Sequence, residues 1–289
     1  MKVEIFDVEH GQCAMIHCPP NGKKLMIDAG HNGSTGWRPS QHFRGQAIED
    51  LVHTNYDEDH ASDLVAVKQN CSINAITHNP TIGSRHLYVM KAEFGMGVGV
   101  RSVYEWLQWL EGQPNARGIP IDLGHLTKRI YYNTYGQAAG QFRDANNLSV
   151  ATFISYAGFT ILFPGDLEVA GWRQIMQLPG FQQDLARTTV LVASHHGREN
   201  GCCEEIFENW IPQAVIISDA GIEHATQETR NWYAARTSGC RTRAGIDRKV
   251  FTTRRDGKIT IDVDGQGQWF IETSTTRPTG TLATLLGEA

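Results

Sequence analysis

The sequence lacks the segments that would place a protein in or across a membrane. No apolar run among its 289 residues approaches the length of about eighteen residues that a membrane-spanning helix requires. The N-terminal stretch 1–13 alternates like a strand and has no apolar core of the kind found in secretory signals. We therefore expect a cytoplasmic protein with no membrane partner.

Cysteine is scarce and does not follow a metal-binding or disulfide pattern. The chain has six cysteines, and none of them forms a CxxC pair. Disulfide frameworks are typical of much smaller secreted chains, and structural zinc clusters need closely spaced cysteines. We expect neither kind of cross-link, so a core of apolar residues, which make up 40% of the chain, must hold the fold together.

Positive charge is in the minority overall but is concentrated in one segment. The net charge is −5, which argues against non-specific binding of nucleic acid by the whole surface. Segment 230–258, in contrast, contains nine lysines and arginines and two aspartates. It is either a surface that faces phosphate groups or an ordinary solvated helix and loop.

Strand and helix patterns alternate along the chain. The patterns predict two strands in 2–18, a hairpin at 147–166 that turns at Ala157 and Gly158, and strands near 23–30, 73–80, 188–197 and 213–221. They predict helices at 100–113, between the last two of these strands, and at 225–239, where Gly239 can cap the C-terminus. Segment 249–273 reads as two or three closing strands. This order predicts an α/β fold of two mixed sheets with helices outside, in one domain over 1–273, followed by a tail or linker at 274–289.

The segment HTNYDEDH, residues 53–60, is unusually rich in metal-binding side chains. In an extended chain, alternate side chains point the same way, so Asn55, Asp57 and Asp59 could converge on one side. Carboxylates this close repel one another, and a divalent cation would offset that repulsion. The alternative is a helix N-cap, but a cap needs only one such residue. The segment therefore predicts a metal site.

With these residues the chain resembles the metallo-β-lactamase superfamily, in particular the hydrolase domain of ComEC-type competence proteins. HTNYDEDH is similar to the HxHxDH metal motif in its HxDxDH form. The stretches FDVEHGQCAMI…LMIDAG, NLSV, ILFPGD, VASHHG and AVIISDAG follow in the expected order, over roughly residues 1–262. The resemblance implies an αββα sandwich with one or two metal ions at one edge of the sheets.

The resemblance also implies roles for individual residues. The metal ligands it implies are Asn55, Asp57, Asp59, His60, Asp166 and His224, with Asp166 bridging two ions. Asp59, His195 and His196 are the candidate catalytic residues; one histidine of the pair could instead ligate the metal or make a structural hydrogen bond. Asn147, Ser149 and Asp28 are expected to line the site. Arg254 and Arg255, in the basic segment, are expected to bind substrate.

Asn55 departs from the family pattern, which has histidine at this position. Either its amide oxygen coordinates a metal or the ligand is lost. An oxygen-rich set of ligands shifts the expected metal from Zn²⁺ towards Mn²⁺, with Mg²⁺ as a further alternative, or leaves one occupied site.

The function that these features predict is metal-dependent hydrolysis of a phosphodiester in DNA by a metal-activated water, with nucleic acid as the substrate and protein partners in a multi-component system. Two alternatives remain at this stage. One is a small-molecule hydrolase, such as a lactonase, a thioesterase or a cyclic-nucleotide phosphodiesterase, because the fold hosts all of these. The other is a metal-poor, degenerate interaction domain.

Overall fold

Two β-sheets form the centre of the molecule. The computed structural model describes residues 1–93, 95–113, 121–221 and 225–275. The first sheet has the strand order β17-β16-β1-β2-β3-β4-β5; β3, β4 and β5 run parallel and the other neighbours antiparallel. Its strands are β1 (Lys2–Ile5), β2 (Ala14–Cys18), β3 (Lys23–Ile27), β4 (Ala47–Val52), β5 (Ser72–Thr77), β16 (Ile259–Val263) and β17 (Trp269–Thr273).

The second sheet has the order β15-β12-β11-β10-β9-β6. Its strands β10, β11, β12 and β15 are parallel, and β9 and β6 complete it in antiparallel fashion. The strands are β6 (Thr127–Tyr132), β9 (Val150–Tyr156), β10 (Phe159–Phe163), β11 (Val190–Val192), β12 (Ala214–Ile217) and β15 (Val250–Thr252). Two small ribbons pair β7 (Thr134–Tyr135) with β8 (Gln141–Phe142) and β13 (Cys240–Arg241) with β14 (Asp247–Arg248).

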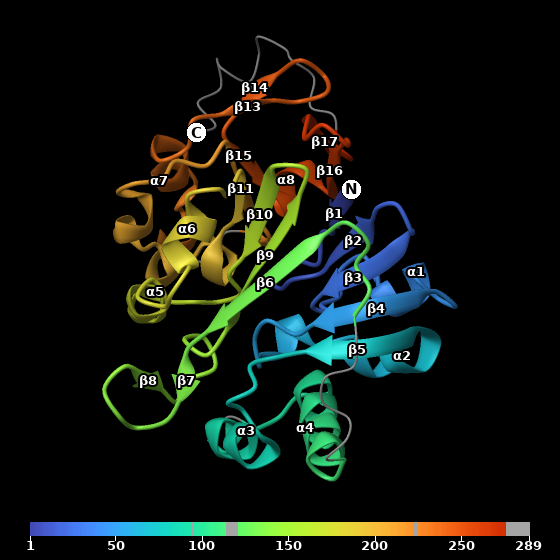
Figure 1. Cartoon of the computed structure of the whole chain (residues 1–289). Helices are drawn as coiled ribbons and strands as arrows, with labels where there is room; N and C mark the ends of the chain where they lie inside the picture. Colours follow the sequence, from blue (N-terminus) through green and yellow to red (C-terminus); the bar gives the residue numbers. More distant parts are fainter. Residues whose placement is uncertain (94, 114–120, 222–224, 276–289) are drawn as a thin grey trace.

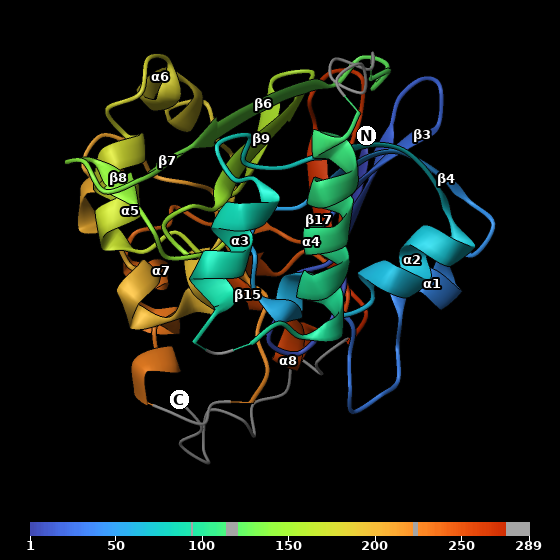
Figure 2. The ribbon, with the colours of Figure 1, turned by 90° about the horizontal axis from the view of Figure 1, so that it is seen from below.

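Helices cover the outer faces of both sheets. In Figure 1, α1 and α2 lie beside the first sheet, α3 and α4 lie below it, and α5, α6 and α7 lie beside the second sheet. In the view from below in Figure 2, α5, α6 and α7 again lie on one side of the molecule, and α1 and α2 lie on the other. The helices are α1 (Pro39–His42), α2 (Leu64–Asn70), α3 (Ser84–Lys91), α4 (Val98–Glu111), α5 (Val169–Ile175), α6 (Phe181–Leu185), α7 (Arg230–Ala235) and α8 (Thr253–Asp256). The predicted αββα sandwich is therefore confirmed.

Alternate strand residues build separate layers of core. Leu25 and Ile27 of β3 face the core between the sheets, whereas Met26 packs in the layer beneath α2 and α4. In β12, Ile216 faces the central core and Val215 faces the helices on the other side. Because side chains alternate along a strand, each buried strand can contribute to two layers, and this explains the nearly continuous apolar runs in the sequence.

Several predicted elements need correction. The segment between β11 and β12 contains only short 3-10 turns, η2 (Ser194–Gly197), η3 (Glu199–Gly201) and η4 (Glu204–Phe207), and no α-helix. Helix α7 ends at Ala235 with Arg236 as its C-cap, so Gly239 does not cap it. Of the two or three closing strands predicted, the structure has three, but β15 joins the second sheet and α8 separates it from β16. Periodicity does not reveal which sheet a strand joins, because that depends on contacts far along the chain.

Among the described residues, no helix combines the length and the apolar character needed to cross the membrane. The predicted tail or linker at 274–289 lies almost entirely outside the described residues, which end at 275. The boundary at 273 coincides with the last residue of β17, but the division into domain and tail stays a prediction.

The carboxyl ends of the parallel strands meet at one edge of the sandwich. Asp28 follows β3, Asp166 follows β10, and the turn η1 (Glu58–His60) follows β4. The turn η2 follows β11, and Ser218 follows β12. In parallel sheets the loops after the strands collect at this edge, so polar residues from distant parts of the sequence are brought together there.

Candidate metal centre

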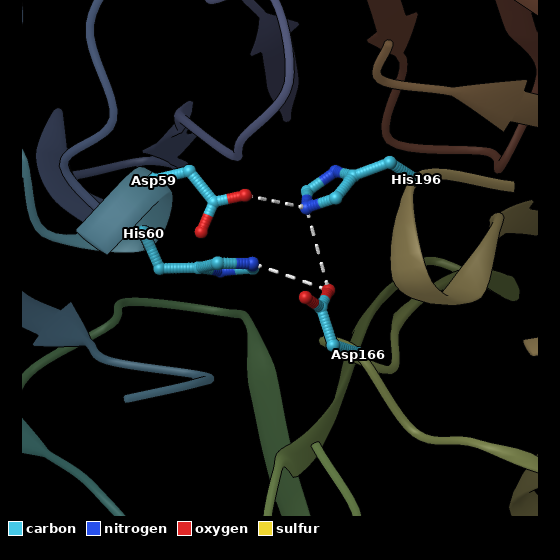
Figure 3. Close-up of side chains that lie close together, drawn as sticks. All are labelled: Asp59, His60, Asp166 and His196. Atoms are coloured by element: carbon cyan, nitrogen blue, oxygen red, sulfur yellow. Dashed lines mark ion pairs between the residues drawn. The ribbon is translucent and has the colours of Figure 1, made fainter. Parts of the chain in front are cut away.

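Four side chains converge at this edge. Asp59 and His60 come from η1, Asp166 comes from the turn after β10, and His196 comes from η2 after β11. One ligand atom of each residue lies within 4.8 Å of those of the others. Figure 3 shows all four side chains pointing toward one another. Two residues thus come from the first sheet and two from the second, and the centre lies across the mouth of the sandwich.

The imidazole nitrogens of the centre lack ordinary hydrogen-bond partners. His60 Nε2 lies 3.1 Å from Asp166 Oδ1, and His196 Nε2 lies 3.3 Å from Asp59 Oδ2 and 3.5 Å from Asp166 Oδ1. Both nitrogens are buried and neither makes a hydrogen bond within the described part of the chain. Buried polar atoms are seldom left in this condition. Two imidazoles and two carboxylates whose atoms face one another match the donor set of a divalent transition-metal ion.

The other ring nitrogen of each histidine is held in place. His60 Nδ1 lies 2.8 Å from Asp28 Oδ2, and His196 Nδ1 donates to the backbone oxygen of Ser218 at 3.0 Å. Asp28 is fully buried and accepts hydrogen bonds from the backbone N–H and the hydroxyl of Thr54. Such outer partners fix the tautomer that leaves Nε2 free for a metal. Asp28, expected only to line the site, orients a candidate ligand.

The electrostatics of the centre show mutual dependence between acids and imidazoles. Burial favours the neutral forms, but the carboxylate of Asp166 outweighs it and raises the pKa of His196. Burial would likewise raise the pKa of Asp59, but the contact with His196 and the charge of His60 lower it overall. Each carboxylate is therefore held ionised by positive charge beside it. A divalent cation would supply that charge in place of the imidazole protons.

The loops around the centre adopt unusual backbone conformations. His195 and His196 both have positive φ, 50° and 54°, and Gly197 follows with φ 74°. Non-glycine residues adopt this region at a cost of about 1–2 kcal/mol each, so the surrounding packing must enforce it. At the opposite wall, a Cβ atom on Gly30 would overlap the carbonyl of Asp59, which explains the glycine in LMIDAG.

The first half of the HTNYDEDH segment does not join the cluster. Asn55 accepts a hydrogen bond from the backbone N–H of Asp57 at 2.9 Å, and its amide donates to Asn146 and Ser149. The Asp57 carboxylate pairs with Lys91 of α3. The expectation that alternate residues converge on one side is wrong here. The chain is extended at Asp57 but turns into η1 at Glu58, so the two-residue period ends before Asp59.

Glu58, the remaining acid of the segment, has a structural role that the sequence did not indicate. Its carboxylate accepts hydrogen bonds from the backbone N–H groups of Gly99 and Val100, in the first turn of α4. These donors have no partner within the helix, and a carboxylate also favours the positive end of the helix dipole. The three acids of the segment thus serve three purposes.

Of the other predicted site residues, some contact a candidate ligand and others stabilise structure outside the cluster. The Asn147 side chain accepts from the backbone N–H of Gly171, and Ser149 Oγ accepts from the backbone N–H of Asp166 at 3.0 Å. Ser149 therefore supports a candidate ligand, whereas Asn147 supports the start of α5. His224 lies outside the described residues, so its predicted role as a ligand stays a prediction.

His195 and the two arginines also received predicted roles. His195 is buried, and its Nδ1 lies 3.8 Å from Glu168 Oε1; burial lowers the pKa of its imidazole. Arg254 is mostly buried and pairs with Asp219 at 2.6 Å, so its charge is already compensated. Arg255 faces a separate groove, which is described below.

The comparisons with known proteins agree with the motifs. No protein-family model matches the chain. ComE operon protein 3 of Bacillus subtilis (strain 168) is 21% identical over an alignment of 238 positions, which covers 75% of this chain and 28% of that protein. The predicted resemblance to the competence-type proteins is confirmed. The chain spans less than a third of the length of the curated relative that it matches.

A solved structure also aligns with the chain. It is the crystal structure of a proposed metal-dependent hydrolase of Parabacteroides distasonis ATCC 8503, with a TM-score of 0.46 and 12% identity. The alignment covers 86% of this chain and 91% of that one.

Proposed function

We propose that the chain is a metal-dependent hydrolase whose centre holds one divalent cation on Asp59, His60, Asp166 and His196. The observation that carries the proposal is the pair of buried Nε2 atoms, without hydrogen-bond partners, that face two carboxylates from the opposite sheet edges. Two nitrogen and two oxygen donors suit Zn²⁺ or Mn²⁺ better than Mg²⁺, which prefers oxygen ligands alone.

The geometry favours one ion over two. A second ion in the family arrangement would need Asn55 and Asp57, but the Asn55 amide is engaged in three hydrogen bonds and Asp57 pairs with Lys91. Moving either residue into the centre would break these interactions. His224, which is not described, is the residue that could still complete the coordination of a single ion.

Catalysis in this proposal depends on how the chain presents the centre to substrate. A bound divalent ion lowers the pKa of a coordinated water and neutralises negative charge on a phosphoryl oxygen. The cavity behind His60, Asp166 and His196 has a volume of about 10 Å³, room for about one water. Substrate must therefore approach from the outer side, where the Asp59 side chain is 35% exposed.

Two side chains, the partly exposed Asp59 and the buried His195, are the candidates for proton handling. Asp59 is the exposed carboxylate of the cluster and can accept a proton from the attacking water. His195, beside His196, has an Nδ1 without a hydrogen-bond partner in the described part of the chain, and the lowered pKa of its imidazole keeps it mostly neutral at pH 7. As a neutral imidazole it can hydrogen-bond to the leaving group.

We propose a phosphodiester of DNA as the substrate. The resemblance to competence-type proteins implies such an activity, and basic residues concentrate in segment 230–258. A lactone carries no phosphate group, so the basic segment favours a phosphate-bearing substrate over a lactone. The metal-poor interaction domain is disfavoured because the four converging residues are all present and correctly oriented.

The test is a nicking assay on supercoiled plasmid with Mn²⁺, Mg²⁺ and Zn²⁺ added in turn, together with metal analysis of the purified chain. We expect one tightly bound ion per chain and cleavage that chelation abolishes and Mn²⁺ or Zn²⁺ restores. A chain that binds one ion and hydrolyses a thioester or lactone but no phosphodiester would contradict the substrate. A chain that binds no ion would contradict the hydrolase.

A further inference from the structure

A basic groove lies apart from the metal centre. Its volume is about 560 Å³, and its charged lining residues are Arg230, Arg243, Arg248, Arg255, Asp256 and Glu272. They come from α7, from the β13–β14 ribbon and its connection, from α8 and from β17. The ribbon, α7 and β17 lie in the upper part of Figure 1. A second hollow of about 700 Å³ adjoins it and shares Arg230 and Arg248, so the groove continues past these two side chains.

Two of the four arginines have their charge compensated by the protein. Arg248 pairs with Asp256 at 2.7 Å, and Arg243 pairs with Asp262 at 2.8 Å and also contacts Glu272. Within the described residues Arg230 and Arg255 make no ion pair, although both are partly buried. Burial, followed by the positive charges of Arg255 and Arg248, lowers the pKa of Arg230. Like charges are thus held together at a cost in stability that an anion in the groove would offset.

Residues next to the lining arginines in the chain link the groove to the metal centre. Thr229, the residue before Arg230, donates from its hydroxyl to the backbone oxygen of Gly197, which follows His196. On the other wall Arg254, the neighbour of Arg255, pairs with Asp219, and the backbone oxygen of the adjacent Ser218 accepts from His196. The chain neighbour of each of these two arginines is therefore held beside His196: Thr229 contacts the turn itself, and Arg254 pairs with the residue next to Ser218.

We propose that this groove binds the sugar–phosphate backbone of DNA through Arg230 and Arg255 and guides the strand toward the metal centre. The proposal rests on the function proposed above and adds the residues that would hold the substrate. Guanidinium groups match phosphate oxygens in pairs and remain charged when partly buried. The groove is far larger than one phosphate requires. The described lining residues include no aromatic side chain on which an unpaired base could stack. Contacts to phosphate carry no sequence information, so binding should not depend on base sequence.

The test compares the wild-type chain of 289 residues with Arg230→Gln/Arg255→Gln. Affinity for fluorescein-labelled DNA duplexes is measured by anisotropy at several salt concentrations, with EDTA present to prevent cleavage. Removing one arginine–phosphate interaction should reduce the slope of log affinity against log salt by about 0.9. Two duplexes of unrelated sequence should bind equally. The matched control is Arg44→Gln/Arg187→Gln, which removes the same charge from two exposed positions outside the groove and should keep the wild-type slope.

Thermal unfolding and metal content of each variant show whether it is folded and loaded. Equal slopes for wild type and the groove variant would overturn the proposal, as would wild type that does not bind DNA. Equal competition by poly-L-glutamate, charge for charge, would also overturn it, because the groove would then bind acidic chains in general. Hydrolysis of bis(p-nitrophenyl) phosphate by wild type tests the proposed function separately, since this small diester does not need the groove.

Discussion

The two ends of the HTNYDEDH segment have opposite roles, although they lie only a few residues apart. Asn55 and Asp57 are engaged by the protein itself, through Asn146, Ser149 and Lys91. Asp59 and His60 face Asp166 and His196 across the mouth of the sandwich. The segment is continuous in sequence, but only its second half faces the cluster. A side chain becomes available to a ligand only where the fold leaves its polar atoms without internal partners.

This contrast has a local cause in the backbone. β4 ends at Val52, the chain bends at Tyr56 and Asp57, and at Glu58 it turns into η1. The turn rotates Asp59 and His60 toward the second sheet. Glu58 meanwhile caps α4, which holds the turn in place. Three substitutions test the contrast and a fourth, at a structural acid of β1, gives a reference; they follow from the largest expected effect to the smallest.

The largest effect is expected from removing a carboxylate of the cluster. Asp166→Ala should lose the bound ion and more than about 100-fold of metal-dependent activity, because ligand loss exceeds the about 10–100-fold cost of losing an outer partner. The matched control is Asp57→Ala, which removes a carboxylate of the segment that pairs with Lys91 outside the cluster. Metal analysis should find the ion retained in Asp57→Ala; its loss from both variants would show that the first half of the segment also holds the ion.

An intermediate effect is expected at the residue that orients His60. Asp28 has φ 54°, which asparagine tolerates, so Asp28→Asn should fold. The amide is a weaker acceptor for His60 Nδ1, and we expect metal affinity to fall by about 10–100-fold. Isothermal titration with Zn²⁺ on the metal-free chain measures it. An unchanged affinity would mean that the His60 ring is positioned by packing alone.

At Asn55 we expect an effect on stability and not on metal binding. Asn55→Ala removes a buried side chain and leaves the Asp57 N–H, Asn146 and Ser149 without their partner. Unsatisfied buried groups cost about 1–3 kcal/mol in unfolding free energy. Denaturant unfolding of metal-free protein gives this value, and metal analysis should still give one ion. A drop in metal content with unchanged stability would identify Asn55 as a ligand.

The smallest effect is expected at an acid with a purely structural role. Glu4 of β1 contacts His17, Lys258 and Lys2. The hydrogen bond with His17 is the largest cause of the lowered pKa of the Glu4 carboxyl, and it outweighs burial, which would raise that pKa. A lowered pKa means that the ionised form stabilises the fold above the unfolded value of about 4.3 and that this stability is lost as pH falls. Glu4→Gln should therefore be less stable than wild type at pH 7, and the difference should shrink below about pH 4.

Urea unfolding at several pH values, with EDTA present, measures this difference without interference from the metal centre. Metal content and activity of Glu4→Gln should match wild type. A difference in unfolding free energy that stays constant from pH 7 to pH 3 would show that the contribution of Glu4 does not depend on its charge.

The sequence by itself determined the layers of the fold and most of the metal-binding residue types. Alternation and apolar runs predicted the hairpin at Ala157 and Gly158, the strands around it and the amphipathic α4, because these patterns reflect local geometry. The ordered motifs predicted that Asp59, His60, Asp166 and His196 would belong to one site. These patterns are properties of short segments, so they can be read without knowing how the segments pack together.

Only the tertiary structure decided which polar residues are free to bind a ligand. Asp57 forms an ion pair with Lys91, and Arg254 forms one with Asp219. The Asn55 amide donates hydrogen bonds to Asn146 and Ser149. None of these pairings follows from local sequence, because the partners come from other parts of the chain: Asn146, for example, lies 91 residues from Asn55. A hydrogen bond or ion pair depends on distance in space, and the packing of the two sheets against each other and against the helices sets that distance.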